Sequence, residues 1–161
     1  MGLYINIRTE NSLGSLLSKT FQSFVNGFEI DGESCELNQV SKLLNLDLKP
    51  FTIFNYSGLW DESEFPEDRK DELIKKQIEN DKIWNDINEF LDLINILIHS
   101  INTEEINSKK ITHKYDWWNK YFELPNENDN NDNFLTDLKI IKNFLIVEIK
   151  NGETKTAFYS E

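Results

Sequence analysis

The stretch that decides the fold is Asp81–Ile101, DKIWNDINEFLDLINILIHSI. Its apolar residues recur at steps of three and four, a spacing that lines one face of an α-helix. This row consists of Ile83, Ile87, Phe90, Ile94, Leu97 and Ile101. A second apolar row lies beside the first, and the polar residues follow one narrow strip. We therefore predict a core helix over 81–101, with neighbours on several sides.

Composition limits what this helix and its chain can be. Five charged residues interrupt the stretch, which argues against a membrane span. The chain has 161 residues, of which 39% are hydrophobic and 12% aromatic, so we expect one globular domain, 1–161, despite the net charge of −12. A single cysteine, Cys35, and an N-terminus without a signal-peptide pattern predict a reducing, cytoplasmic location.

The two ends of the sequence predict strands. Apolar and polar residues alternate over Leu3–Arg8, as they do in a strand with one buried face. A last strand is predicted over Thr154–Ser160. Together these patterns predict an α+β fold, with about five helices around the 81–101 helix and a small, mainly antiparallel sheet that includes both terminal strands.

Several shorter elements are predicted before the central helix. Leucines and phenylalanines at helical spacing predict a helix over 13–26. Asp31-Gly32 favours the turn of a small hairpin over 28–37. Asn38 is predicted to cap a short helix, and a mostly polar helix is predicted over 66–80, where proline suits the first turn.

Two interpretations compete near the C-terminus. Five apolar residues return to helical spacing: Phe134, Leu138, Ile141, Leu145 and Ile149. In the rival interpretation, Leu145–Lys150 pairs with Glu153–Tyr159 as a hairpin that turns at Asn151-Gly152. We favour the helix because it accounts for more apolar positions, and the hairpin stays open.

Most of the net charge is gathered in less than a third of the chain. Residues 61–106 hold 14 acidic and 5 basic residues, so −9 of the total of −12 lies there. Such a field repels nucleic acid and membrane phosphates and attracts a basic partner. Solubility is the alternative explanation for an acidic surface.

No motif for catalysis or cofactor binding occurs. The two histidines, His99 and His113, lack the spacing of metal ligands, and neither a glycine-rich phosphate loop nor a GxSxG elbow is present. The polar segment 126–133, NENDNNDN, is rich in oxygen ligands for calcium. However, an EF-hand loop begun in this segment would have Phe134 and Ile140 where glycine and glutamate are needed. We predict no catalytic residue, no metal and no cofactor.

Partner binding is predicted where aromatic rings stand beside carboxylates. Rings fill pockets on a partner, while acids pair with its Lys or Arg side chains. One such group begins at Trp60 and a second lies at 116–122, where Asp116 is also predicted to cap a short helix. The predicted binding residues are Trp60, Asp61, Glu62, Glu64, Asp116, Trp117, Trp118 and Tyr121. Burial in the core is the alternative for these aromatic rings.

The whole chain resembles the small acidic immunity proteins that neutralise bacterial toxins. The resemblance rests on MGLYINIRTE at the start, the acidic 61–106 region and DWWNKYF at 116–122. It is a resemblance of type, in size, charge and absent catalytic motifs, and it carries over no family residues. It implies a non-enzymatic protein that occludes a basic toxin such as a nuclease. Steering by charge would speed capture, and aromatic anchors would slow release.

Two other classes of function stay open. A nucleic-acid mimic that inhibits a host defence nuclease would also present ordered carboxylates to a basic groove. A small enzyme would require a cleft that holds His99 or His113 with carboxylates. None of the three readings involves a membrane, and the first two involve no direct contact with nucleic acid.

Overall fold

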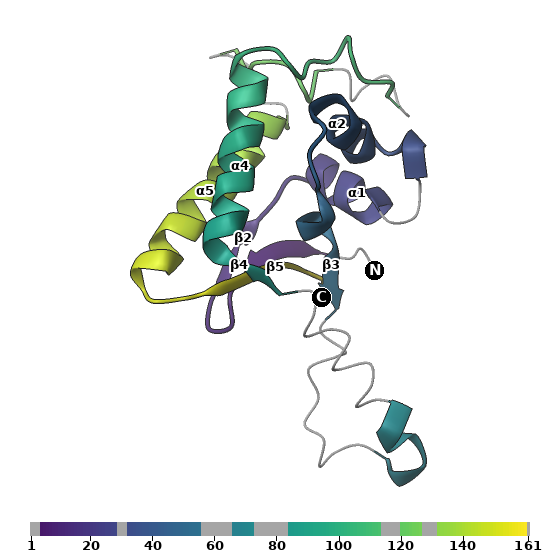
Figure 1. Cartoon of the computed structure of the whole chain (residues 1–161), viewed down its shortest axis with the longest axis vertical. Helices are drawn as coiled ribbons and strands as arrows, with labels where there is room; N and C mark the ends of the chain where they lie inside the picture. Colours follow the sequence, from purple (N-terminus) through teal and green to yellow (C-terminus); the bar gives the residue numbers. More distant parts are fainter. Residues whose placement is uncertain are drawn as a thin grey trace.

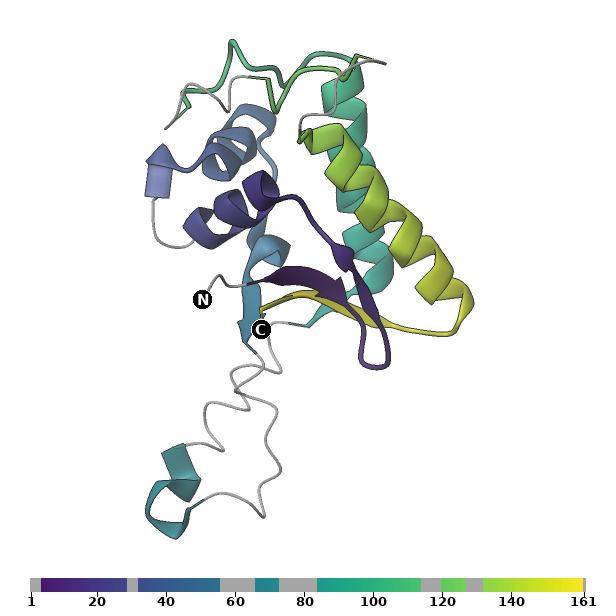
Figure 2. The ribbon, with the colours of Figure 1, turned by 180° about the vertical axis from the view of Figure 1, so that it is seen from behind.

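A computed structural model describes residues 4–28, 32–55, 66–72, 84–113, 120–126 and 132–160. The α-helices within these ranges lie on the same side of a small sheet, with α4 and α5 side by side at one edge of the molecule (Figure 1). Seen from behind, the same two helices still lie together, away from α1 and α2 (Figure 2). Within the described ranges, no helix combines the length and apolar character that crossing a membrane requires.

The sheet joins the two ends of the chain. Its strands are β1 (Ile5–Arg8), β2 (Leu13–Leu16), β3 (Ile53–Asn55), β4 (Asn85–Asp86) and β5 (Lys155–Ser160). Their order is β2-β1-β5-β3, and β4 pairs with β5 off this path. Only the pairing of β3 with β5 is parallel among the described strands. The predicted α+β class, with a mainly antiparallel sheet that contains the first and last strands, is confirmed.

Strand β2 replaces the first part of the helix predicted over 13–26, so that prediction is wrong there. The reason is Gly14, which lies directly against β1. A Cβ at this position would lie 2.7 Å from Cγ2 of Ile7 and 2.9 Å from its carbonyl oxygen. Only glycine allows such a close approach, and it also weakens a helix. The strands turn where the Thr9 N–H donates to the Ser12 carbonyl at 2.9 Å.

Helix α1 (Lys19–Phe28) accounts for the rest of that prediction. It begins after Ser18, whose Oγ accepts a hydrogen bond from the Phe21 N–H at 3.2 Å and so acts as a cap. Gly27 lies inside the helix and does not end it.

The hairpin predicted over 28–37 is also wrong. Gly32–Ser34 forms a short 3₁₀ turn, η1, and helix α2 (Glu36–Leu44) follows. Asn38, the predicted cap, lies inside α2. Its Nδ2 donates to the carbonyls of Phe28 at 2.9 Å and of Gly32 at 2.7 Å. The turn signal at Gly32 therefore serves the connection from α1 to α2.

Helix α4 (Ile87–Asn102) is the predicted core helix, but it begins six residues later than expected. Asn85 and Asp86 pair with β5 as strand β4, and the Asp86 carboxylate accepts from the N–H groups of the next turn at 2.9 and 3.0 Å. This cap marks the start of the helix. The predicted apolar row is buried along α4, at Ile87, Phe90, Ile94, Leu97 and Ile101. Residues 81–83 lie outside the described residues.

Helix α5 (Phe134–Lys150) decides between the two interpretations of the C-terminus. The favoured one, a helix followed by a strand, is confirmed. Asn133 caps α5, because its Oδ1 accepts from the N–H of Leu135 at 2.9 Å. Gly152, at φ 89°, takes the left-handed conformation that reverses the chain toward β5.

Phenylalanines form the centre of the core between the sheet and the helices. The ring of Phe158, on β5, lies 5.1 Å from Phe51, 5.5 Å from Phe21 and 5.6 Å from Phe90, measured between ring centroids. Phe51 belongs to the short 3₁₀ helix η2 (Lys49–Phe51). Three helical segments that are distant from β5 in the sequence thus pack on this strand.

Two predicted helices are described only in part. The one predicted over 66–80 starts as a 3₁₀ turn, η5 (Glu67–Arg69), with helical residues at 70–72. Residues 73–80 lie outside the described residues. So do residues 114–119, which hold most of the short helix predicted after Asp116.

Candidate functional site

A strip of acidic residues runs along the outward face of α4. Asp86, Glu89 and Asp92 are exposed and follow each other at steps of three, which keeps them near one side of the helix. We call these three residues the α4 acidic strip. Asn88 and His99, also exposed, continue the polar face that the sequence predicts. The negative charges lie in the first turns of α4, where the helix dipole stabilises them.

Lys155 lies opposite Asp86 in the β4–β5 pair, yet no described basic side chain forms an ion pair with this strip. None of the described residues forms an ion pair with Asp86, Glu89 or Asp92, and residues 84–108 contain neither Lys nor Arg. Lys110, which follows soon after, directs its Nζ to the backbone carbonyls of Glu104 and Glu105, at 3.2 Å each. The strip is therefore a negative surface that faces solvent.

Of the predicted partner-binding residues, Tyr121 alone falls within the described ranges. It is only 2% exposed, so it is not a surface anchor. Its ring packs edge-on against Phe24 at 5.0 Å and lies 5.7 Å from Phe134. The other predicted residues lie outside the described residues: Trp60, Asp61, Glu62, Glu64, Asp116, Trp117 and Trp118.

Tyr121 instead belongs to a buried polar cluster that the sequence patterns do not predict. Its hydroxyl donates to Oδ2 of Asp137 at 2.8 Å, and Ser18 Oγ donates to the same oxygen at 2.6 Å. The Ser18 N–H donates to Oδ1 at 3.1 Å. Asp137 is 2% exposed, although it lies in the first turn of α5. The cluster joins the start of α1, the 120–122 segment and α5.

Burial controls the protonation of this cluster. It raises the pKa of the Asp137 carboxyl, while the hydrogen bonds from Ser18 and Tyr121 act in the opposite direction. Burial also raises the pKa of Tyr121 well above its ordinary value, and the nearby Asp137 charge adds to this effect. The phenol therefore stays protonated as a donor. We assign the cluster a structural role, because its donors are already used within the fold.

Hollows in the described surface lie next to residues 123–126, near the C-terminal end of α4 and the start of α5. One of them, of about 460 Å³, is lined by the buried side chains of Ile106 and Phe122 and by the charged residues Glu104, Lys109 and Glu123. Charges of both signs thus surround it. We expect no strong preference for a cation or an anion there.

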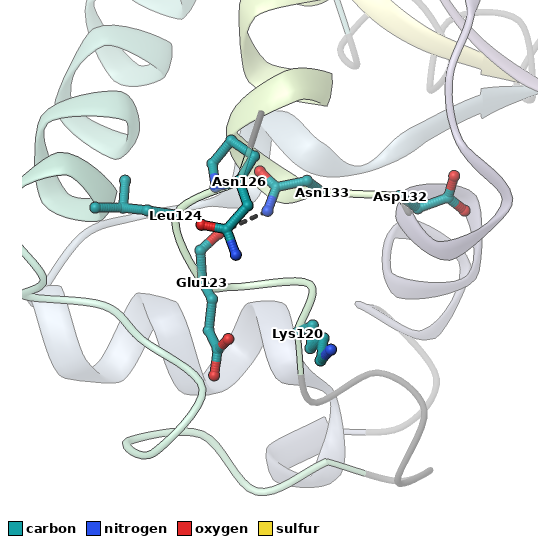
Figure 3. Close-up of a pocket in the computed structure, with 7 residues that line it drawn as sticks. Lys120, Glu123, Leu124, Asn126, Asp132 and Asn133 are labelled. Atoms are coloured by element: carbon teal, nitrogen blue, oxygen red, sulfur yellow. Dashed lines mark hydrogen bonds between the residues drawn. The ribbon is translucent and has the colours of Figure 1, made fainter. Parts of the chain in front are cut away.

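The smaller hollow, of about 110 Å³, is drawn in Figure 3. Asn133 Nδ2 donates to the backbone oxygen of Glu123 at 2.6 Å, and the Glu123 side chain extends away from that contact. Its carboxylate accepts from Ser108 Oγ at 2.6 Å. The loop after α4 and the segment before α5 are thereby fastened to each other.

The two histidines have different surroundings and share no hydrogen-bond or ring-contact partner among the described residues. His99 is exposed on α4, whereas His113 is half-buried, with Nε2 3.2 Å from the Ser108 carbonyl and its ring 6.0 Å from that of Phe122. In the described ranges, no three His, Cys, Asp or Glu side chains are grouped so that they could hold a metal ion. Cys35 is buried, with its Sγ 3.4 Å from the Phe24 carbonyl.

Comparison with known proteins returned no relative. No protein-family model, no curated protein and no solved structure matches this chain.

Proposed function

We propose that this protein is a non-enzymatic binding protein that occludes a basic protein partner. The most specific form of the proposal is a cytoplasmic immunity protein that neutralises a bacterial toxin such as a nuclease. The observation that carries it is the α4 acidic strip, Asp86, Glu89 and Asp92, which faces solvent with no ion pair from any described residue. A surface of this kind attracts the positively charged groove that a nuclease needs for its own substrate.

In this proposal, exposed charge and buried aromatic contacts affect different steps of binding. Exposed carboxylates raise the rate of encounter with a basic surface, and their effect falls as salt screens them. Slow release requires buried contacts, commonly aromatic. Trp60, Trp117 and Trp118 are the proposed anchors, with Asp61, Glu62, Glu64 and Asp116 beside them. Because Tyr121 is buried, it supports the neighbouring segment and does not touch the partner.

Affinity capture tests the proposal directly. The immobilised chain is exposed to a lysate of the source organism, and retained proteins are identified by mass spectrometry. We expect a retained basic protein whose binding weakens as salt rises. Its affinity should fall at least about tenfold in the Glu89→Lys/Asp92→Lys variant, because two attractive contacts become repulsive. Affinity unchanged in that variant would remove the α4 acidic strip from the proposal.

A matched control separates local charge from net charge. Glu10→Lys/Glu33→Lys changes the total charge equally but alters exposed acids on other elements, the turn between β1 and β2 and the η1 turn. It should retain the partner. The variants Asp61→Lys/Glu62→Lys/Glu64→Lys and Trp117→Ala/Trp118→Ala then test the remaining predicted contacts. Retention of a host defence nuclease, and not of a toxin, would favour the nucleic-acid mimic instead.

A further inference from the structure

Asn151 and Gly152 form the turn that joins α5 to β5. Asn151 is exposed at the C-terminal end of α5, with φ −79° and ψ −1°. Gly152 is also exposed and has a φ of 89°. In the described part of the chain, no hydrogen bond involves the side-chain amide of Asn151. No contact of this kind therefore holds the amide away from the backbone of the turn.

We infer that Asn151 is a site of spontaneous deamidation. The Gly152 nitrogen attacks Cγ of Asn151 and gives its proton to water, so that a new C–N bond forms. The bond from Cγ to the side-chain nitrogen breaks, and ammonia leaves. Water then opens the five-membered succinimide ring at either carbonyl, which yields aspartate or isoaspartate without any change of oxidation state. Glycine favours this attack because it has no Cβ to crowd the ring, and the two reacting groups belong to adjacent residues.

The end of α5 must open locally before the ring can close. Closure requires rotation about ψ of Asn151, because at −1° the Gly152 nitrogen is turned away from Cγ. This rotation breaks the hydrogen bonds from the Gly152 N–H to the Ile149 carbonyl, at 3.1 Å, and from the Glu153 N–H to the Glu148 carbonyl, at 3.0 Å. Both bonds lie at the exposed end of a helix, and helix ends open at little cost in free energy.

The sequence holds a second Asn-Gly pair, Asn26-Gly27, in a different place in the fold. This pair lies inside α1, and Gly27 is buried. Ring closure there would require helical hydrogen bonds to break next to the core, which costs more than opening a helix end. The structure therefore selects Asn151 as the reactive residue of two that have the same local sequence.

Both products weaken the connection between α5 and β5. Aspartate places a negative charge at the C-terminal end of α5, where the helix dipole disfavours it. Isoaspartate leads the backbone through Cβ, so the turn gains a methylene group. Thr154 follows soon after, and its carbonyl accepts the Ile87 N–H from the start of α4 at 3.0 Å. A change in the turn thus reaches both α4 and β5, and the stability of the protein should decline as each molecule ages.

Peptide mapping of the aged full chain tests the inference. The protein is incubated at mildly alkaline and at mildly acidic pH, and trypsin then releases residues 151–155 between Lys150 and Thr156. This peptide should gain the mass difference between Asn and Asp, and faster at alkaline pH, because the attacking nitrogen must lose its proton. Synthetic peptides identify the aspartate and isoaspartate forms by retention time, and an unincubated sample corrects for conversion during digestion. An unchanged peptide after incubation would overturn the inference.

Incubation of the same chain in guanidinium chloride separates the effect of sequence from that of structure. In the unfolded chain, Asn26 and Asn151 should convert at similar rates, since glycine follows both. In the folded protein, Asn151 should convert at least about tenfold faster than Asn26, because a helix end opens more readily than a helix interior. Equal rates in the folded protein would show that the fold does not select the site.

Asn151→Gln is the matched resistant variant. It keeps the amide, but attack would have to form a six-membered ring, which closes much more slowly. The urea midpoint of wild type should shift to lower concentration with age, whereas that of Asn151→Gln should stay constant. Fresh Asn151→Asp, which carries the charge without the longer backbone, should also have a lowered midpoint.

A midpoint of aged wild type that stays constant despite conversion at Asn151 would contradict the predicted loss of stability. Unfolding of fresh Asn151→Gln verifies that the substitution leaves the fold intact. The inference does not depend on the proposed function, because none of its steps involves a partner or the α4 acidic strip.

Discussion

Tyr121 and Asp137 are joined by a hydrogen bond of 2.8 Å from phenol to carboxylate, and both side chains are buried. This bond links the segment before α5 to the first turn of α5. Ser18 completes the arrangement from the start of α1. Three segments from different parts of the chain are thus held by one carboxylate.

Removal of the phenol hydroxyl should destabilise the fold. Tyr121→Phe leaves the ring in place but takes one donor from a buried carboxylate, at a cost of about 1–3 kcal/mol in the free energy of unfolding. Urea denaturation at neutral pH measures this loss. Tyr4→Phe is the control, since Tyr4 is 54% exposed and should change stability little. Equal effects of the two substitutions would contradict the role of the bond.

The Asp137 carboxyl should make stability depend on pH. Because burial raises its pKa in the folded state, the folded protein holds this proton more tightly than the unfolded chain does. The resulting stabilisation is complete below the unfolded pKa and is lost as pH rises through the folded pKa. The free energy of unfolding of wild type, relative to Asp137→Asn, should therefore fall across this window and then level off. Urea titrations at a series of pH values measure the difference, and a rise with pH would refute the assignment.

The contact of Gly14 with β1 should tolerate no side chain. In Gly14→Ala, the new Cβ would clash with Cγ2 and the carbonyl oxygen of Ile7, so we expect a loss of about 1–3 kcal/mol in the free energy of unfolding. Ser15→Ala, at an exposed neighbouring position of β2, should change it by less than about 0.5 kcal/mol. A neutral Gly14→Ala would show that the hairpin is packed more loosely.

Glu104 adopts a backbone conformation that suits glycine. Its φ of 58° is left-handed, and it follows the end of α4, where glycine is the usual residue. Glu104→Gly should therefore stabilise the protein by about 0.5–1 kcal/mol in thermal or urea unfolding. Glu104→Ala removes the same charge without relieving the backbone, and it should not stabilise. If both variants were stabilised equally, charge and not backbone strain would be the cause.

The spacing of apolar residues predicted those helices in which one face is buried along the whole length of the segment. The apolar row from Ile87 to Ile101 and the helix starting at Phe134 are examples, because their spacing alone determines which face is apolar. Strand β2 could not be predicted in this way. Its leucines suit a helix, and the requirement for glycine at position 14 comes from Ile7 on another strand. Contacts between segments therefore decided the local structure.

In the candidate site, too, some features follow from local spacing and others depend on contacts between distant segments. The exposed acids of α4 follow from helical spacing, whereas the burial of Asp137 does not, because a first-turn acid usually faces solvent. One signal was available: Asp137 lies three residues after Phe134 and four before Ile141, within the apolar row of α5. An acid at such a position predicts a buried donor, here Tyr121. That Trp60, Trp117 and Trp118 bind a partner stays a prediction, because these residues lie outside the described residues.

Strand β5 pairs with β1, β3 and β4, and no two of these three strands pair with each other. On a ribosome, residues 5–8 must therefore wait until residues 155–160 have emerged before they can pair with them. Until then, the newly made β1 and β3 have open edges while the phenylalanines that line the core lack Phe158. Slow, late closure of this kind exposes the nascent chain to chaperones and to aggregation. A frameshift or proteolytic cut just before residue 155 would deprive all three strands of their common neighbour at once.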